Sequence, residues 1–236
     1  MALPIRAILL AAGFGTRLRP LTLTKPKCLV NVAGKPLLSR WLDNLDQIGC
    51  ESVIVNTHYL SDIVEDFVAT LHYKNMQINT DYEDQLLGTA GTLRKHVDFF
   101  EGSTGILIHS DNATTEDLSF VLQSHSKRPK HCFLTMLTFT TDNPSSCGIV
   151  EKDDTNVVIG FHEKTQSPPS NCANGAIYAF DQAFLNFLIT VPSFMTDFST
   201  EIIPLILGRI YSCHTDSIYL DIGTPEGLIR ANELIS

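Results

Sequence analysis

The sequence has 236 residues, of which 44% are hydrophobic and 18% are charged, and this composition excludes a disordered or fibrous chain. The length suits one α/β domain with its own core, so we expect residues 1–236 to form a single domain. The formal net charge of −9 argues against a nucleic-acid binder, which normally presents a basic patch. Phosphorylated small molecules remain open as ligands, because a few well-placed Lys and Arg side chains suffice to bind them.

The first apolar stretch, Ala7–Ala12, is too short to be a signal peptide or a membrane span. We therefore expect a cytoplasmic protein without a membrane partner. The six cysteines are scattered and form no CxxC pair, which favours reduced thiols in the core. The eight histidines show neither HxxxH nor HExxH spacing, so we expect no zinc site.

In the first half of the chain, strand-like and helix-like segments alternate in the rhythm of βαβ units. Such an alternation predicts an α/β fold with a doubly wound, mostly parallel, Rossmann-like sheet. Apolar runs and helical spacing place strands at 5–10, 52–56, 77–80, 105–109 and 131–138, and helices at 37–48, 61–72, 89–97 and 117–126. Ser61 and Thr89 are the residues expected to cap two of these helices.

From Cys147 onward the strand-like segments follow one another closely. They predict a small antiparallel excursion beside the main sheet. The predicted strands are 148–151, 157–163, 174–180 and 210–214, the helices are 182–189, 200–207 and 226–234, and a proline-containing surface loop lies at 166–171.

A glycine-rich loop, Gly13-Phe14-Gly15-Thr16-Arg17, follows the first predicted strand directly. Ligands of such sheets bind outside the strand ends, and glycines let backbone N–H groups converge on an anion. A dinucleotide fingerprint fits badly, because Leu18 stands where Gly or Ala is required. Read alone, the glycine pattern is also compatible with a plain tight turn.

Four cations follow the glycines within a short stretch of an otherwise acidic protein. Arg offers forked donors that match phosphate oxygens, and Lys offers a mobile point charge. A solvated basic loop is the alternative, but the intervening prolines favour an ordered phosphate site. The four cations are Arg17, Arg19, Lys25 and Lys27.

The residues Gly-Phe-Gly-Thr-Arg-Leu-Arg-Pro-Leu-Thr, followed by Pro-Lys-Cys-Leu, resemble the GxGTRLxPLT and PKPL signature of sugar-1-phosphate nucleotidyltransferases. Only Cys28 departs from the second motif, where Pro is commoner. The resemblance implies that Arg17 and Lys27 bind the triphosphate and stabilise the leaving pyrophosphate. It also implies nucleotide contacts from Leu10, Ala11, Ala12, Gly13, Gly15 and Thr16.

Three further segments resemble motifs of this family that bind the nucleotide and the metal. Leu-Gly-Thr-Ala-Gly at 87–91 resembles a base-binding segment, which implies nucleotide contacts from Gly88 and Thr89. His-Ser-Asp at 109–111 stands where the family has Asn-Gly-Asp, and Tyr-Leu-Asp-Ile-Gly-Thr-Pro at 219–225 resembles its terminal motif. The resemblance implies that Asp111 and Asp221 bind Mg²⁺, with Asp111 also catalytic, while His-Ser in place of Asn-Gly leaves open whether metal use is altered.

The sugar side of the site is implied by three looser matches. Phe-His-Glu-Lys at 161–164 resembles FxEKP, in which the Glu contacts sugar hydroxyls and the Lys the sugar phosphate. Cys-Gly-Ile-Val at 147–150 resembles YG(V/I)V, and Asn-Gly-Ala-Ile-Tyr at 174–178 resembles NxGIY. The resemblance therefore implies a catalytic Lys164 and sugar contacts from Gly148, Glu163 and Asn174, with the antiparallel excursion on the sugar-binding side.

The short chain and its Gly-Thr-Ala-Gly segment resemble guanylyltransferases that act on mannose- or heptose-1-phosphate. We therefore expect GTP and mannose-1-phosphate or D-glycero-D-manno-heptose 1-phosphate as substrates, with products serving cell-surface glycans such as lipopolysaccharide or capsule. Uridylyl-, thymidylyl- and cytidylyltransferases remain alternatives because they share nearly every motif. A non-catalytic nucleotide-binding regulator is a further alternative.

A regulator that has lost catalysis would be expected to lose some of the charged residues, but all four are present, namely Arg17, Lys27, Asp111 and Asp221. Leu18 disfavours a nicotinamide-dependent dehydrogenase. The chain is expected to end with the catalytic domain, without the β-helical tail of some relatives, and a homodimer remains open.

Overall fold

The structure, a computed structural model, describes residues 3–235 and divides them into two compact units. The first unit contains Pro4–Leu86, Ile108–Leu118 and residues 217–235. The second contains Leu3, Leu87–Leu107 and Ser119–Asp216. None of the helices in the described range has the length and apolarity needed to cross a membrane.

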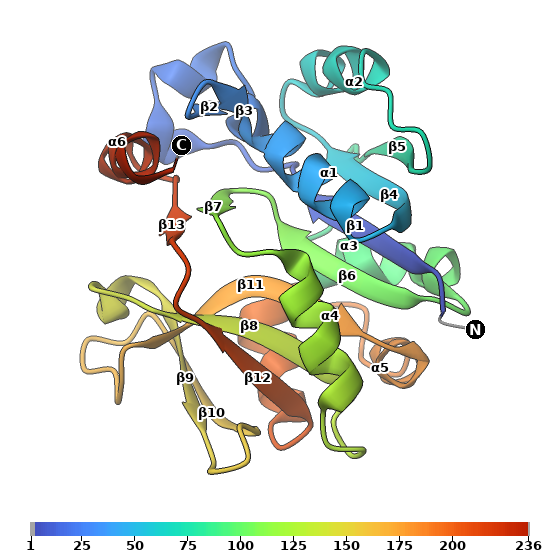
Figure 1. The fold of residues 1–236 in the computed structure, drawn as a ribbon, viewed down its shortest axis with the longest axis vertical. Coiled ribbons are helices and arrows are strands. Elements are labelled where there is room, and N and C mark those ends of the chain that lie inside the picture. The colour runs from blue at the N-terminus through green and yellow to red at the C-terminus, as the bar shows by residue number, and fades with distance from the viewer. Residues whose placement is uncertain (1–2, 236) are drawn as a thin grey trace. The chain divides into compact units, whose positions relative to one another are not determined.

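The first unit contains a parallel sheet in which β4 (Cys50–Thr57) lies between β1 (Ile5–Leu10) and β5 (Gln77–Tyr82) (Figure 1). Two helices, α1 (Leu37–Gln47) and α2 (Ser61–Ala69), pack against β4. β1 and the middle of β4 are buried apolar runs, as expected for strands covered on both faces, whereas β5 at the edge of the sheet is polar and has no buried residue. The fully buried centre of the sheet includes Ala7, Ile8, Leu9, Val53 and Val55.

The first unit also contains several short turns and strands. Three 3₁₀ turns follow the loop after β1, namely η1 (Thr16–Leu18), η2 (Leu21–Leu23) and η3 (Lys27–Leu29), and a two-residue hairpin joins β2 (Asn31–Val32) to β3 (Lys35–Pro36). The end of β6 (Thr104–His109) leads into β7 (Asn112–Thr114), which pairs antiparallel with β13 (Tyr219–Asp221).

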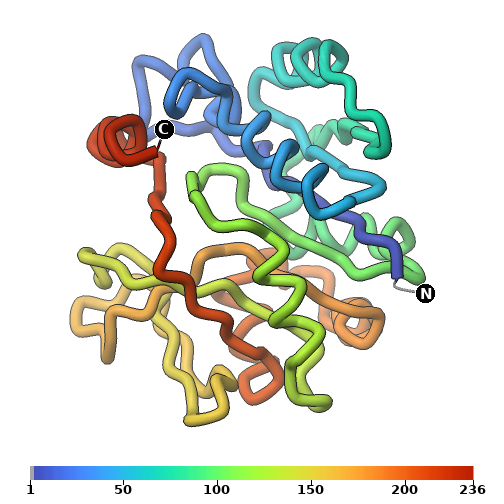
Figure 2. The backbone as a smooth tube through the Cα atoms, viewed as in Figure 1, coloured from blue at the N-terminus to red at the C-terminus, as the bar shows by residue number. Residues whose placement is uncertain are grey.

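The C-terminal helix α6 (Pro225–Leu234) returns the chain to the early part of the first unit. In the tube view it lies beside the turn between β2 and β3 (Figure 2). There the Ala33 N–H donates to Asn232 Oδ1 over 2.8 Å. This bond ties two segments that are 199 residues apart in the sequence.

In the second unit, β8 (Leu134–Thr140) pairs antiparallel with β11 (Cys172–Phe180) and parallel with β12 (Ile210–Thr215). The strand β9 (Gly148–Lys152) pairs antiparallel with β10 (Val158–Glu163) and with β11. The helical segments are α3 (Thr89–Lys95), η4 (Val97–Phe100), α4 (Leu118–Lys127, whose first residue belongs to the first unit), η5 (Pro144–Ser146), α5 (Gln182–Leu188), η6 (Phe198–Ile202) and η7 (Ile203–Ile206).

The predicted α/β class, with parallel strands in the first half and an antiparallel excursion after Cys147, is confirmed. The segment predicted as one helix at 200–207 is instead a π-helical turn, η6, followed by the 3₁₀ turn η7. Pro204 lies in η7 and lacks an N–H group, so it interrupts a regular α-helical ladder.

The two predicted helix caps are wrong. Leu60, in a left-handed conformation, precedes α2 where Ser61 was expected to cap, and Ser61 is the first helical residue. The helix ends at Ala69, short of the predicted end at residue 72, and the Thr70 hydroxyl next to this end donates to the Phe67 carbonyl. Gly88, rather than Thr89, is the residue that precedes α3.

Candidate active site

The glycine-rich loop leaves the buried strand β1 at Leu10 and turns at Gly15, whose φ of +61° is left-handed. The Thr22 hydroxyl donates to the Gly15 carbonyl over 2.7 Å and fixes this turn. The Leu10 carbonyl is already engaged, because it accepts from both the N–H (3.2 Å) and the hydroxyl (2.6 Å) of Ser110. The loop is therefore held at both ends by the first unit.

The N–H groups of this loop fall into two kinds. The Ala11 N–H donates to Asn56 Oδ1 over 2.7 Å. By contrast, within residues 3–235 the N–H groups of residues 12–17 donate to no protein acceptor. Successive free N–H groups next to a left-handed glycine can form an anion-binding concavity. The loop thus has the donors that a phosphate requires, although the Ala11 N–H is occupied.

Lys27 brings two distant carboxylates together. Its Nζ lies 2.7 Å from Asp111 Oδ2 and 3.8 Å from Asp221 Oδ1. The Lys27 side chain is only 10% exposed, whereas those of Asp111 and Asp221 are 41% and 50% exposed. A nearly buried ammonium is costly unless it is paired, and these two carboxylates supply the pairing. The predicted association of the three residues is thus found within the first unit.

Arg17 lies on the solvent side of this cluster. Its guanidinium is 3.5 Å from Asp221 Oδ2, with a side-chain exposure of 61%. Such an exposed pair contributes little to stability, so the contact leaves Arg17 able to bind other anions. The close approach depends on Gly223, because a Cβ at that position would lie 2.6 Å from Arg17 Nη2 and 2.7 Å from Asp221 Oδ1.

The positions of Asp111 and Asp221 follow from the short β7–β13 ladder. Asp221 is opposite Asn112 in this ladder, and the Ile222 N–H donates to the Asp111 carbonyl over 3.2 Å. Helix α1 supports β7 from one side, since Trp41 Nε1 donates to the Asn112 carbonyl over 3.0 Å.

The loop after β7 is held by the same helix. Asn44 donates through Nδ2 to the Glu116 carbonyl over 2.8 Å and accepts through Oδ1 from the Leu118 N–H over 3.0 Å. The sequence did not predict roles for Trp41 and Asn44. In the sequence Trp41 is typical of a buried core position, and Asn44 is typical of the polar face of a helix.

The pKa of Asp111 reflects two opposing effects. Desolvation acts to raise it, while the positive charge of Lys27, the neighbouring His109 and the hydrogen bond from Lys27 act to lower it. The net effect places the pKa of Asp111 below its usual value, so Asp111 is a carboxylate at neutral pH.

Asp111 and Asp221 are a suitable donor pair for a hard cation. Both direct an oxygen toward the Lys27 ammonium, so positive charge is already accommodated at this point. Across residues 3–235, no His, Cys, Asp and Glu side chains form a group of three or more that could hold a metal ion. Two carboxylates nevertheless suit Mg²⁺, which usually keeps several waters and takes further ligands from substrate phosphates.

The segment predicted to contact the base belongs to the second unit. Gly88 has φ +76°, and a Cβ there would lie 2.6 Å from the Thr196 carbonyl oxygen, so only glycine fits. The Ala90 N–H donates to this same carbonyl over 2.8 Å. Thr89 Oγ1 accepts from the Phe198 N–H over 2.7 Å. Gly88 and Thr89 thus have clear structural roles within the unit, and nucleotide contact remains a prediction for them.

The predicted sugar-side residues also lie in the second unit, on β9, β10 and β11, except Lys164, which directly follows β10. Lys164 Nζ is 3.3 Å from Glu163 Oε1, and the Lys164 side chain is 67% exposed. The Glu163 carboxylate packs close to Gly148, so these three residues form one cluster. Lys164 has φ +47°, and its N–H donates to the Cys147 carbonyl over 3.1 Å. The local backbone therefore fixes the direction in which this exposed cation leaves the strand.

Asn174 has a structural role in this unit. Its Nδ2 donates to the Tyr178 hydroxyl over 2.6 Å, and its Oδ1 accepts from the Ala176 N–H over 2.9 Å. The pairing of β11 with β8 shifts register between Asn174 and Tyr178, so the side chain bridges a bulge. Both ends of the amide are engaged, and sugar contact remains a prediction for this residue.

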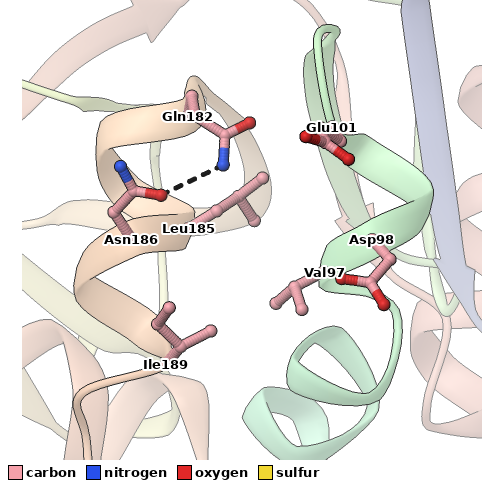
Figure 3. A pocket seen from close by; sticks show the side chains of 7 residues that line it. All are labelled: Val97, Asp98, Glu101, Gln182, Leu185, Asn186 and Ile189. Carbon is pink, nitrogen blue, oxygen red and sulfur yellow. Dashed lines mark hydrogen bonds between the residues drawn. The ribbon is translucent and has the colours of Figure 1, made fainter.

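A cleft of about 170 Å³ in the second unit contains none of the predicted site residues. It lies between η4 and α5 (Figure 3), where Asp98 and Glu101 face Gln182 and Asn186. Gln182 and Asn186 hydrogen-bond to each other over 3.1 Å. Two carboxylates and no cation make this cleft unsuitable for a triphosphate, which needs positive charge.

Residues 6–236 match the family described as nucleotidyl transferase, and the chain belongs to this family. The mannose-1-phosphate guanylyltransferase of Mycobacterium tuberculosis is 30% identical over 233 residues, which cover 97% of this chain and 64% of that protein. The mannose-1-phosphate guanylyltransferase catalytic subunit beta of Drosophila melanogaster is 30% identical over 229 residues, 95% of this chain and 61% of that protein. The chain therefore spans less than two thirds of the length of these relatives.

A solved structure confirms the fold. HddC from Yersinia pseudotuberculosis, complexed with GMP-PN, superposes with a TM-score of 0.81 and covers 98% of this chain and 99% of its own. At 24% sequence identity this likeness shows the fold alone. The family match over residues 6–236 and the 30% identical relatives confirm the family resemblance drawn from the sequence motifs.

Proposed function

We propose that this protein transfers a nucleotidyl group from a nucleoside triphosphate to a sugar 1-phosphate, releasing pyrophosphate and forming a nucleotide sugar. The observation that carries this proposal is the meeting of Lys27 with Asp111 and Asp221 in the unit that contains the free N–H groups of the glycine-rich loop. N–H groups that donate to phosphate oxygens, a buried cation and a carboxylate pair are the components that phosphoryl transfer requires.

Positioning and charge neutralisation supply the catalysis in this proposal. A phosphate oxygen of the sugar 1-phosphate attacks the α-phosphorus in line, the new P–O bond forms, and the bond to the β-phosphate oxygen breaks. The sugar phosphate is already anionic, so no protein nucleophile is needed. Lys27 and Arg17 hold the β- and γ-phosphates and stabilise the charge that develops on the leaving pyrophosphate.

Mg²⁺ is the proposed cofactor, held by Asp111 and Asp221. When bound, it would act as a Lewis acid on phosphate oxygens and as a template for their orientation. The support from this structure is the shared direction of the two carboxylates.

For the second unit we propose contacts with the sugar 1-phosphate. The exposed ammonium of Lys164 is the group for its phosphate, and the carboxylate of Glu163 is an acceptor for sugar hydroxyls. Gly148 provides room beside Glu163, and Asn174 keeps the bulge of β11 in place. Gly88 and Thr89 are proposed to contact the base.

GTP and mannose-1-phosphate are the substrates we favour, with D-glycero-D-manno-heptose 1-phosphate as the second sugar candidate. Both curated relatives are described as mannose-1-phosphate guanylyltransferases, and HddC is described in complex with GMP-PN. The products would be precursors of surface glycans made in the cytoplasm, such as lipopolysaccharide or capsule.

A pyrophosphate-release screen tests this function directly. GTP, UTP, dTTP, CTP and ATP are each combined with mannose-, glucose- and heptose-1-phosphate, with and without Mg²⁺. We expect Mg²⁺-dependent release with GTP and mannose-1-phosphate. A preference for UTP, dTTP or CTP would identify one of the alternative transferases. Binding of GTP without turnover in any combination would instead favour a regulatory relative.

A further inference from the structure

A buried hydrogen-bond chain begins at the glycine-rich loop and ends at a carboxylate that no motif includes. Asn56 Oδ1 accepts from the Ala11 N–H over 2.7 Å, and Asn56 Nδ2 donates to Glu83 Oε1 over 3.0 Å. Asn56 is 3% exposed and Glu83 is 3% exposed. The chain therefore links the ends of three neighbouring parallel strands, β1, β4 and β5.

The chemistry of this chain makes its geometry specific. A primary amide accepts through its oxygen from one partner and donates through its nitrogen to another. An ionised carboxylate can only accept, and a hydroxyl donates and accepts through a single oxygen atom. Glu83 as an acceptor determines which end of the Asn56 amide faces it, and the carbonyl end is then left for Ala11. A buried polar group that loses its partner is costly, so the three groups favour one arrangement.

Glu83 also supports the loop through its backbone. The Glu83 carbonyl is 2.8 Å from His58 Nδ1, and the Glu83 N–H donates to the Thr57 carbonyl over 2.8 Å. The His58 ring packs edge-on against Phe14, with ring centroids 5.4 Å apart. The loop is thus held at two points, at Ala11 through Asn56 and at Phe14 through His58.

Residues 12–17, whose N–H groups have no protein acceptor, directly follow Ala11 and include Phe14. The directions of these N–H groups depend on where Ala11 and Phe14 are fixed, since a short loop has few conformations once its start and middle are set. Preorganised donors bind an anion without the entropic cost of ordering the loop.

We propose that Asn56 and Glu83 are positioning residues that hold the glycine-rich loop in the conformation that binds the triphosphate. They act through the backbone of Ala11 and touch no reacting atom. The proposal rests on the proposed function for its kinetic test, but its structural part can be measured without turnover.

The kinetic test compares Asn56→Leu, which removes both hydrogen bonds at nearly constant size, with the wild-type protein. We expect the KM for GTP to rise about tenfold or more, the size of effect that one lost buried hydrogen bond produces. The kcat and the KM for mannose-1-phosphate should each change less than about threefold, because the loop donors act mainly on triphosphate binding. The more conservative Glu83→Gln keeps an oxygen acceptor and should stay within about threefold of wild type, while Glu83→Leu should resemble Asn56→Leu.

Thr57→Val is the matched control. Thr57 is the neighbouring residue on β4, is 1% exposed, and its hydroxyl donates to Glu65 Oε1 over 3.2 Å. This variant also removes a hydrogen bond from a buried side chain, but on the side of α2. We expect it to lower thermal stability without raising the KM for GTP.

Limited trypsin digestion gives a readout that does not need activity, because Arg17 lies in the loop and is followed by Leu18, whereas Arg19 is followed by Pro20 and is therefore a poor trypsin site. Cleavage after Arg17 in the unliganded protein should accelerate about tenfold in Asn56→Leu and remain near the wild-type rate in Thr57→Val. If Asn56→Leu does not fold, Glu83→Leu undergoes the same two measurements.

Unchanged cleavage together with an unchanged KM for GTP in a folded Asn56→Leu protein would overturn the positioning role. An equal KM increase in Thr57→Val would do the same, since it would reveal a general loss of stability. If the wild-type protein releases no pyrophosphate with any substrate pair, the proposed function fails, and the trypsin comparison still decides whether Asn56 and Glu83 order the loop.

Discussion

Lys27 and Asp111 are 84 residues apart in the sequence and are joined by a hydrogen bond of 2.7 Å between Nζ and Oδ2. The bond connects the 3₁₀ turn η3 to the residue directly before β7, and Asp221 joins it from the end of β13. A cation that holds two carboxylates together also determines what happens when it is removed, since Asp111 and Asp221 then repel each other.

Replacing Lys27 by Ala tests the cation at the centre of the site. We expect turnover to fall by at least about a thousandfold, because the donor to the leaving phosphates is lost. Pyrophosphate release under saturating substrate is the measurement. Lys35→Ala is the control, since Lys35 is 44% exposed and pairs with Asp43 instead. A Lys27→Ala protein that keeps more than a tenth of the activity would contradict the assignment.

Replacing Gly223 by Ala tests the contact between Arg17 and Asp221. A methyl group there would lie 2.6 Å from Arg17 Nη2, and both flexible side chains must move. Because these side chains are largely exposed, we expect the melting temperature to change by less than about 3 °C. The kcat/KM for the triphosphate should fall at least tenfold. A normal kcat/KM in this variant would show that the Arg17 position does not matter.

Replacing Asn44 by Ala tests the support that α1 gives to the Asp111 region. Two hydrogen bonds to the backbone of residues 116 and 118 are lost, so we expect about 1–3 kcal/mol less unfolding free energy and a higher Mg²⁺ concentration for half-maximal activity. Urea unfolding and a Mg²⁺ titration measure the two effects. Gln47→Ala, on the exposed face of the same helix, should change neither. If Asn44→Ala loses stability with an unchanged Mg²⁺ requirement, the helix supports only the fold.

The stability of the protein should depend on pH through His125. Burial, with a smaller effect from the charge of Arg128, lowers the pKa of His125 from 6.5 to about 3. Its Nδ1 is 2.9 Å from Thr135 Oγ1. Well above pH 6.5 the ring is neutral in both states and has no effect. As the pH falls below 6.5 the unfolded chain takes up a proton that the folded chain does not, so the unfolding free energy decreases.

The expected slope from His125 is about 1.4 kcal/mol per pH unit between pH 6 and pH 4. Urea unfolding at several pH values measures it, with His125→Asn as the variant in which this contribution disappears. His131→Gln, at an exposed position, is the control and should keep the wild-type slope. Equal slopes in wild type and His125→Asn would show that the buried imidazole is not the cause.

The sequence predicted the long elements well because their apolar spacing is regular. The strand at Ile5–Leu10 was predicted with its observed bounds. The β7–β13 ladder was missed, since strands of three residues leave no periodic pattern. The segment after Phe198 was also missed, because the apolar spacing there is helical while Pro204 prevents a regular α-helix.

The candidate site was predictable only in part. The residue types of Arg17, Lys27, Asp111 and Asp221 came from motifs, but their meeting depends on a tertiary arrangement that no spacing reveals. Asn56 and Glu83 carried a weak signal, as polar residues at or just after the ends of two strands. That signal does not tell which backbone group a buried amide binds.

The cluster of four charged side chains that includes Lys27 has a consequence for how ligands approach. Arg17 and Lys27 balance Asp111 and Asp221, so this cluster is electrically neutral within a chain whose formal net charge is −9. An anionic nucleotide therefore meets the protein's overall repulsion at long range and a balanced charge at close range. Moderate salt would screen the repulsion, so association with the nucleotide should become faster, whereas a basic binding groove would lose on-rate under the same conditions.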